Sequence, residues 1–519
     1  MPQRQGCGMR ASLRGPRCGI RILCAVALIA GALAIPGSGA SAQNVLMIEG
    51  AAPLAPARPL PGRVAPAAAA PSASGAARAV AADPCADHAE ACRDARRKLS
   101  EDLKAASDVA GGQAAAGGAR AEKENTPAPP AAYGGLREAA AATDLRFGMI
   151  VPLSGANKEF GAELKLGAET AFAAANEAGG VNGRALKVFA ADDGYDPART
   201  PDVLKSLVDK ERIFGCLSNF GTPTSASILP YVLEHKLIFF GAFSGAGVLR
   251  RDPPDRYVSN YRASYAEETE AATRYLIKVR RIAPAEIAVF AQDDAFGESG
   301  YAGVEKAMRA LNEIGSILHL RYPRNTIDVA SAIEELSRRE TTRTARGKKI
   351  GGPHIKAVIM VATYRAAAKF VEKAREQFPE LILTNVSAVG SNNFAEELRL
   401  LGPRYIKGIV VTQVVPDPNG YSSIALEFKN ALIKYFPLEH PDYVAFESYI
   451  NAKILIEGLK RAGPAADSDK VVAGLESIHG WDIGLGATIN FSVSEHQAVH
   501  KVWGTQLDEN GTFKPIDLE

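Results

Sequence analysis

The stretch that decides the fold reads DLRFGMIVPLSGANKEFGAELKLGAETAFAAANEAGGVNGR over residues 144–184. Its first part, residues 145–153, is a short apolar run of the kind that forms a buried strand. The part that follows places apolar side chains at helical spacing and stops at Gly179 and Gly180, which favour the end of a helix. A strand followed by such a helix is the repeating unit of α/β proteins.

The same alternation of short strands and helices continues towards the end of the chain. Further strands are predicted, in chain order, at residues 185–193, 213–220, 237–243, 286–292, 317–322, 357–363, 381–389 and 408–415. A crossing segment at residues 257–264 separates the strands into two groups. The pattern therefore predicts fold class α/β, with two similar doubly wound lobes.

Three later segments depart from this rhythm. A long helix is predicted over residues 443–462, because apolar side chains recur there at helical spacing. Residues 487–493 and 501–507 alternate in polarity like a closing antiparallel pair. The stretch 337–353 is rich in Arg, Lys, Thr and Gly, which indicates a solvated loop on the second lobe rather than a basic binding site.

Length and charge limit the class of protein. The 519 residues exceed a typical domain of roughly 100–200 residues, so more than one domain is expected. The 60 Lys and Arg residues against 58 Asp and Glu give a net charge of +2. A charge this small creates no field that would attract nucleic acid or an anionic membrane surface. We therefore expect no nucleic-acid partner.

The N-terminal residues 1–42 have the features of a secretory signal peptide. Several arginines precede the apolar run 22–35, and the small residues Ala40, Ser41 and Ala42 follow it. We expect cleavage before Gln43 and a mature protein in the periplasm. The apolar run is shorter than the roughly 20 residues of a membrane helix, and no later segment is long and uncharged enough to span a bilayer.

Residues 43–143 are dominated by Ala, Pro and Gly and hold few large apolar side chains. Such a segment cannot bury enough surface to offset the entropy of ordering, so we interpret it as a disordered tether with one short helix within residues 87–109. Cys85 and Cys92 are close enough in sequence for a small disulfide loop in an oxidising compartment. Cys216 lies in a strand-like run and is interpreted as a small buried apolar residue.

Four short motifs follow one another in order: GMIVPLSG at 148–155, NEAGGVNGR at 176–184, DDGYDP at 192–197 and DDAFG at 293–297. With them, the chain from residue 145 to residue 515 resembles the leucine-isoleucine-valine-binding family of type I periplasmic binding proteins. These are the substrate-binding subunits of branched-chain amino acid ABC transporters. The resemblance implies two doubly wound lobes, three crossovers and a central cleft that holds the ligand.

The resemblance also implies lobes that are discontinuous in sequence. Lobe 1 is expected at residues 144–264 plus 414–486, and lobe 2 at residues 265–413 plus 487–519. The implied function is to bind a small polar organic solute, an amino acid or a related carboxylate or amide, by hinge closure, and to deliver it to membrane permease subunits. We expect a monomer that is not an enzyme and needs no cofactor or metal. A ligand-sensing or regulatory module of the same fold is the alternative, and a hydrolase ranks last.

The candidate ligand site in lobe 1 lies where two strands give way to helices or turns. Within NFGTPTS at residues 219–225, Thr222 is a candidate N-cap with Pro223 at the first helical position, and free backbone N–H groups there would donate to a carboxylate. The resemblance assigns a ligand-carboxylate contact to Thr222 and to Ser244. Gly245 lets the backbone approach a ligand closely. Phe243 is either a cleft wall or ordinary core.

The candidate site in lobe 2 consists of aromatic side chains and one position that departs from the family pattern. The resemblance implies that Tyr364 covers the ligand and that Phe296 forms another wall, while Tyr265 either joins them or packs between the lobes. Amino-acid-binding members carry an acidic residue where this chain has Ser387. Since an unpaired buried ammonium is costly, the ligand is expected to lack an amine.

The remaining polar residues predict no reaction centre. The pairs Asp192–Asp193 and Asp293–Asp294 each end a strand, where Asp commonly caps or is solvated, so we favour a structural role over acid/base catalysis. His235, His319 and His354 form no ligand-like cluster in the sequence, and the HExxH, GxSxG and EF-hand patterns do not occur.

Overall fold

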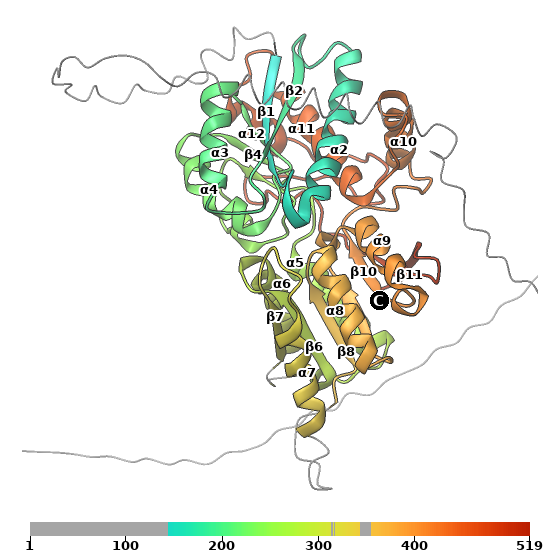
Figure 1. The fold of residues 1–519 in the computed structure, drawn as a ribbon. Coiled ribbons are helices and arrows are strands. Elements are labelled where there is room, and N and C mark those ends of the chain that lie inside the picture. Colours follow the sequence, from blue (N-terminus) through green and yellow to red (C-terminus); the bar gives the residue numbers. More distant parts are fainter. Residues whose placement is uncertain (1–143, 313–314, 316, 343–353) are drawn as a thin grey trace, which may run out of the picture. The chain divides into compact units, whose positions relative to one another are not determined.

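Two sheets form the framework of the protein (Figure 1). The computed structural model describes residues 144–312, 315, 317–342 and 354–519, and all of these belong to one compact unit of the chain. The predicted signal peptide, the tether with its short helix, and the Cys85–Cys92 pairing lie outside the described residues. No described helix has both the length and the apolar character that crossing a membrane requires.

The first sheet has the strand order β2-β1-β3-β4-β5, and every neighbouring pair of strands is parallel. The strands are β1 (Asp144–Val151), β2 (Ala185–Asp192), β3 (Gly215–Leu217), β4 (Ile238–Phe240) and β5 (Val258–Ser259). Along β1, side chains alternate between faces: Phe147 and Met149 enter one core layer, while Ile150 packs in the other with Ile228 and Phe239. Both faces of this sheet are therefore buried, as in a doubly wound fold.

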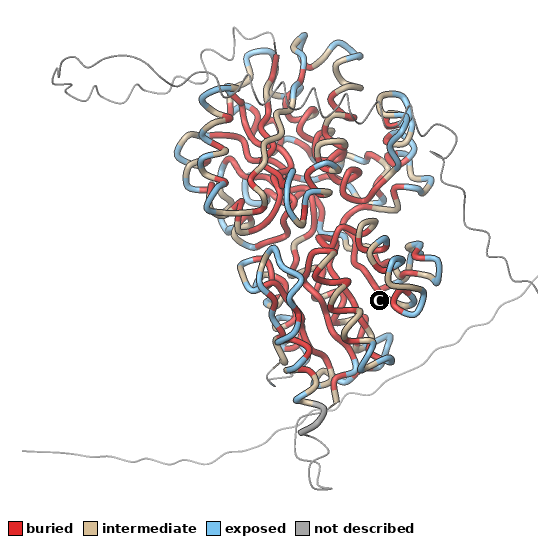
Figure 2. The backbone as a smooth tube through the Cα atoms, in the orientation of Figure 1, coloured by how far each residue is buried: buried red, intermediate tan, exposed pale blue. Residues whose placement is uncertain are grey.

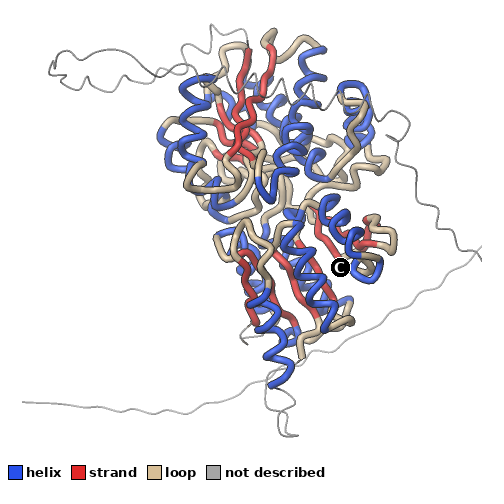
Figure 3. Tube along the Cα trace, in the orientation of Figure 1, coloured by secondary structure: helices blue, strands red, loops and turns tan. Residues whose placement is uncertain are grey.

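Helices cover both faces of the first sheet (Figure 3). On one side lie α2 (Lys158–Glu177), α11 (Tyr443–Ala462) and α12 (Ser468–Glu476), and on the other α3 (Thr200–Ser206) and α4 (Thr222–Glu234). The helix α10 (Ser423–Tyr435) contacts α2 and α11. The prediction of a helix over residues 443–462 is confirmed, and its start is fixed by Asp442, whose carboxylate accepts hydrogen bonds from the N–H groups of Val444 and Ala445.

The second sheet has the order β12-β11-β10-β9-β8-β6-β7. Its strands are β6 (Ile287–Gln292), β7 (Leu318–Tyr322), β8 (Ala357–Val361), β9 (Ile382–Asn385), β10 (Val410–Gln413), β11 (Trp503–Leu507) and β12 (Phe513–Ile516). The helices that pack on it are α5 (Tyr265–Arg274), α6 (Ala295–Ala310), α7 (Ala330–Thr342), α8 (Tyr364–Gln377) and α9 (Ser391–Leu401). Figure 2 shows that the inner strands of both sheets are buried, while the edge strands β2 and β12 and the outer helices keep exposed residues. The predicted α/β fold class with two doubly wound lobes is confirmed.

Two local predictions are wrong. Residues 487–493 contain no strand, and β11 pairs instead with β10 and β12, because the last residues of the chain turn back and supply the antiparallel partner. The loop predicted for residues 337–353 is helical at its start, since α7 continues to Thr342. Residues 343–353 lie outside the described part of the chain.

The segment that leads to β11 packs on the first sheet. Phe491 contacts Phe240 of β4, with 6.3 Å between ring centroids, and the N–H of Ala498 donates to the carbonyl of Asn260 over 2.8 Å. The expected lobe boundary at residue 486 stays a prediction, and these contacts favour a third crossover that follows Ala498.

Candidate functional site

The candidate residues of lobe 1 lie just beyond the carboxyl ends of β3 and β4, where parallel sheets place ligands. Phe220 follows β3, Phe243 follows β4, and the two residues form a parallel bridge with their rings stacked at 5.8 Å. This bridge brings Thr222 and Ser244 together. Their hydroxyl oxygens are 2.8 Å apart and share a hydrogen bond, and both side chains are buried. The structure thus places two candidate carboxylate contacts side by side.

The prediction that Thr222 caps α4 is wrong. The N-cap is Gly221, at φ 92°, and no side chain caps this helix, so Thr222 occupies the first helical position and Pro223 the second. Only glycine adopts this left-handed backbone readily, and a Cβ on Gly221 would lie 2.3 Å from Cε2 of Tyr195. The glycine turn starts the helix one residue earlier than predicted, and the hydroxyl of Thr222 is left to bond Ser244.

A small cavity lies beside Thr222 and is walled by aromatic rings from both lobes. The rings are those of Tyr195, Phe220, Phe243, Tyr265 and Phe296. Gly221, Thr222, Thr363 and Ala388 complete its lining. Its volume is about 10 Å³, room for about one water molecule, because the rings pack on one another at centroid distances of 4.8–5.8 Å.

This cavity unites some of the candidate residues and leaves others out. Four candidates line it: Thr222, Phe243, Tyr265 and Phe296. Four do not: Ser244, Gly245, Tyr364 and Ser387. Sequence reasoning missed Tyr195 and Thr363. Tyr195 stands inside the DDGYDP motif at residues 192–197, so the motif itself was a usable signal, whereas no pattern around Thr363 marks it.

Tyr364 holds the two lobes together at the start of α2 rather than lining the cavity. Its hydroxyl donates to the carbonyl of Ala156 over 2.8 Å and also to the carboxylate of Glu159, and its ring packs on Phe160. Burial and the neighbouring carboxylate of Glu159 raise the pKa of the Tyr364 hydroxyl above its usual range. It therefore stays protonated as a donor at neutral pH.

Gly245 positions Tyr265 at the start of α5. The N–H of Tyr265 donates to the carbonyl of Gly245 over 2.8 Å, and a Cβ on Gly245 would lie 2.5 Å from that nitrogen. Ser264 and Glu267 form a capping box that begins α5 at Tyr265. The ring of Tyr265 is thus fixed against Phe296, with 5.0 Å between centroids.

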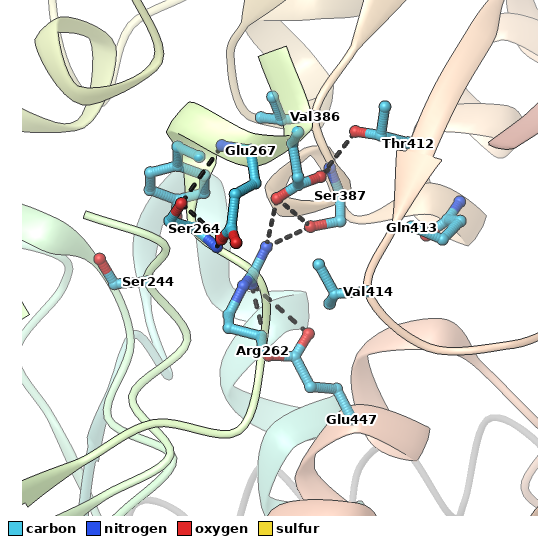
Figure 4. A network of polar contacts seen from close by, with 12 residues as sticks. Ser244, Arg262, Ser264, Glu267, Val386, Ser387, Thr412, Gln413, Val414 and Glu447 are labelled. Carbon is cyan, nitrogen blue, oxygen red and sulfur yellow. Dashed lines mark hydrogen bonds and ion pairs between the residues drawn. The ribbon is translucent and has the colours of Figure 1, made fainter. Parts of the chain in front are cut away.

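Ser387 belongs to a buried polar network centred on Arg262, which sequence reasoning did not identify (Figure 4). The guanidinium of Arg262 donates to Ser387, to Glu268 over 2.9 Å and to Glu447 over 3.3 Å. Arg262 follows β5 in the first crossing segment, whereas Glu447 lies on α11. The network therefore joins segments that lie far apart in the sequence.

Glu268 is saturated with donors in this network. Its carboxylate accepts from the Ser387 N–H over 2.8 Å, from the Ser387 hydroxyl over 3.0 Å and from the Thr412 hydroxyl over 2.6 Å, in addition to Arg262. Burial raises the pKa of the Glu447 carboxyl to about 7, and the charge of Arg262 opposes this shift only in part. The Nε of Arg262 is buried and has no acceptor among the described residues.

A second arginine, the half-buried Arg250, supports the loop that carries Ser244. Arg250 donates from Nη1 to the carbonyls of Ser244 and Ala246 over 3.1 Å, from Nη2 to the carbonyl of Arg262, and from Nε to Gln497 over 2.6 Å. Burial, together with the nearby charge of Arg262, lowers the pKa of Arg250 to about 10. The loop after β4 is thus tied to the crossing segments.

The paired aspartates have structural roles, as the sequence predicts. Asp192 accepts from the N–H groups of Leu153 and Ser154, and Asp193 accepts from the Tyr195 N–H and the Thr200 hydroxyl. In the second lobe, Asp294 caps α6 and Asp293 pairs with Arg321 over 2.7 Å. Each of these carboxylates is engaged in a hydrogen bond or an ion pair.

Cys216 is fully buried, and burial raises the pKa of its thiol to about 12, which confirms the interpretation as a buried small residue. Within the part of the chain that the structure describes, no group of His, Cys, Asp and Glu side chains could hold a metal ion.

Two proteins with curated descriptions are similar to this chain over more than half of its length. It is 26% identical over 293 residues to the amino acid binding protein of Pseudomonas aeruginosa, which covers 53% of this chain and 70% of that protein. It is 22% identical over 352 residues to the Leu/Ile/Val-binding protein homolog 8 of Brucella abortus, over 65% of this chain and 81% of that protein.

A solved structure from Rhodopirellula baltica, described as a possible leucine/isoleucine/valine-binding protein, is 34% identical. It covers 73% of this chain and 97% of its own, with a TM-score of 0.66. The family described as periplasmic binding protein matches residues 144–512. Its members bind solutes outside the cytoplasmic membrane and are not enzymes. The chain belongs to this family of type I periplasmic binding proteins, with relatives of the leucine-isoleucine-valine-binding kind.

Proposed function

We propose that the protein captures a small polar organic solute between its lobes and delivers it, as a monomer, to the permease subunits of an ABC transporter. The observation that carries this proposal is the hydroxyl pair of Thr222 and Ser244, which lies beside a cavity walled by rings of both lobes. Such a site, at the carboxyl ends of parallel strands and between two lobes, suits a ligand that both lobes touch.

The proposed mechanism is capture on lobe 1 followed by hinge closure of lobe 2. Polar contacts between the lobes support it: Asn157 donates to Asn325 over 2.9 Å, and Asn393 donates to Glu163 over 2.6 Å. These bonds form only when the lobes meet, so they would stabilise the liganded form that a permease recognises. We also propose that residues 1–42 direct export and are removed before Gln43.

Thermal unfolding of the purified protein tests this function. The panel contains amino acids, amides, urea, and aliphatic and aromatic carboxylates. A solute at 100 times its dissociation constant adds about 2.7 kcal/mol to the free energy of unfolding, which raises Tm measurably. Small-angle scattering with that solute should then give a smaller radius of gyration. If no member of the panel raises Tm, the solute-binding proposal is wrong.

A further inference from the structure

The cavity between the lobes offers no partner for a positive charge. Among the described residues that line it, none carries a carboxylate; five are aromatic, and the polar side chains are those of Thr222, Thr363, Tyr195 and Tyr265. A primary ammonium has three N–H donors and is strongly hydrated, so its transfer into such a cavity requires an acidic acceptor. An apolar body, in contrast, gains from contact with these rings.

The carboxylate nearest to the Ser387 loop is already occupied. Glu268 is completely buried and accepts hydrogen bonds from Arg262, from Thr412 and from both the N–H and the hydroxyl of Ser387. A ligand ammonium would have to displace one of these donors, which would leave it unpaired in the interior.

The other carboxylates that face the cleft are also engaged. Glu159 accepts from the hydroxyl of Tyr364 and from Arg365. Asp294 accepts hydrogen bonds from the N–H of Phe296 and, over 3.2 Å, from the guanidinium of Arg324. Glu163 of α2 keeps a buried Oε2 without a partner, but burial raises the pKa of its carboxyl well above the usual range, which disfavours the anion that an ammonium needs.

Arg262 places positive charge directly behind two walls of the cavity. Its guanidinium carbon lies 5.2 Å from the ring centroid of Phe243 and 5.3 Å from that of Tyr265. These two rings therefore already make cation–π interactions with the guanidinium of Arg262. Arg250 adds a second guanidinium, and the charges of both arginines act on the carboxyl of Glu447, which weakens the attraction of that carboxyl for an ammonium.

The opposite end of the site suits an anion. The hydroxyls of Thr222 and Ser244 are within hydrogen-bond distance of each other, and either can turn its proton towards a ligand. Thr222 begins α4, where backbone N–H groups lack intrahelical acceptors, and Ser244 lies beside it in the loop after β4. Two hydroxyl donors and a helix N-terminus together match one carboxylate group.

We infer that this cleft selects small monocarboxylates with a branched or aromatic apolar body and excludes their α-amino acid counterparts, with Arg262 as the residue that determines this specificity. The inference rests on the proposed function, because it names the class of solute that the same cleft takes. It differs from what the amino-acid-binding relatives would suggest, because it follows from the charges around this cavity.

Matched ligand pairs test it by isothermal titration calorimetry on the full mature protein. 4-Methylpentanoate is compared with L-leucine, and 3-phenylpropanoate with L-phenylalanine; each pair differs only at the α-carbon. We expect at least one carboxylate to bind 100-fold or more tightly than its amino acid. Equal or tighter binding of the amino acids overturns the inference and leaves the proposed function standing. If only amides or urea bind in the thermal screen, the inference is likewise overturned and the proposed function stands. If no solute binds, the inference and the proposed function are both wrong.

Two variants, each with a matched control variant, test the roles of Thr222 and Arg262. Thr222→Val should weaken the carboxylate about 10-fold, while Ser225→Ala, on the same turn but outside the cavity lining, should leave the affinity unchanged. Arg262→Gln should narrow the ratio between the carboxylate and amino acid affinities at least 10-fold, and Arg262→Lys, which keeps the charge, should preserve that ratio. An unchanged ratio in a folded Arg262→Gln protein contradicts the role of Arg262. If that variant does not fold, the ligand pairs measured on the wild-type protein still test the selectivity, and Thr222→Val still tests the contact with the carboxylate.

Discussion

Tyr195 and Gln292 join the two lobes: Nε2 of Gln292, at the end of β6, donates to the hydroxyl of Tyr195 over 2.9 Å. Tyr195→Phe removes this bond and keeps the ring that walls the cavity. Because a hydrogen bond contributes about 0.5–1.5 kcal/mol, we expect affinity for the most stabilising solute of the thermal screen to fall about 2- to 10-fold, chiefly through faster dissociation. Stopped-flow fluorescence measures this. Tyr301→Phe, outside the lining, is the control, and equal dissociation rates would exclude a role for the bond in closure.

Gly245→Ala should destabilise the protein by about 1–3 kcal/mol, because the new Cβ would lie 2.5 Å from the Tyr265 nitrogen and would push α5 away from the loop after β4. Urea unfolding monitored by circular dichroism gives the free energy. Gly247→Ala is the matched control, since a Cβ there meets nothing within 4 Å. Similar losses in the two variants would show that the close approach at Gly245 is unimportant.

Glu447 should make the protein less stable as the pH rises. Burial raises its pKa from 4.5 to about 7, so between these values the folded protein holds a proton that the unfolded chain has released. Stability contributed by this proton is complete below about pH 4.5 and is lost as the pH rises through about 7, by on the order of 2 kcal/mol.

Glu447→Gln, which is neutral at every pH, should flatten this dependence. The check is the free energy of unfolding in urea at pH 5 and pH 7.5 for both proteins. An equally steep fall in the variant would assign the pH dependence to another group.

Glu267 acts in the opposite direction. Burial disfavours its charge, but hydrogen bonds from His500, Ser264 and Gln497 lower its pKa to about 2. The stability that it contributes is present above about pH 4.5 and is lost as the pH falls through about 2. Glu267→Gln should therefore lower the free energy of unfolding by about 1 kcal/mol at pH 6, after allowance for solvent screening, with a difference that shrinks towards pH 2. Titration calorimetry of acid unfolding checks this, with exposed Glu234→Gln as the control.

The framework could be predicted from the sequence because strand and helix periods are local. The helix over residues 443–462 matches α11 at both ends, since its apolar spacing is long and Asp442 marks its start. The strand predicted at residues 213–220 is much shorter, Gly215–Leu217. Ser218 and Asn219 interrupt the strand after Leu217, and Phe220 then makes an isolated bridge to Phe243 while its ring walls the cavity. Hydrophobicity alone cannot show that the ladder is interrupted there.

The candidate site was predictable only in part. Thr222 and Ser244 follow strands, and residues at the carboxyl ends of parallel strands converge. Arg262 could not be identified, because two of its partners, Ser387 and Glu447, are 125 and 185 residues away in the chain. Tyr364 follows its strand as predicted, yet its hydroxyl bonds Ala156, since the orientation of a side chain depends on what the other lobe presents.

The aromatic walls have a thermodynamic consequence for uptake. Because the five rings can pack on one another until only about 10 Å³ remains, they compete with any solute for the same contacts. The fraction of molecules whose lobes meet without cargo is unable to load, so the apparent dissociation constant exceeds the intrinsic one by the reciprocal of the competent fraction. The rings therefore act as an internal competitive inhibitor. Replacing one of them by a smaller side chain would remove a contact with the solute but would raise the fraction of molecules that can bind it.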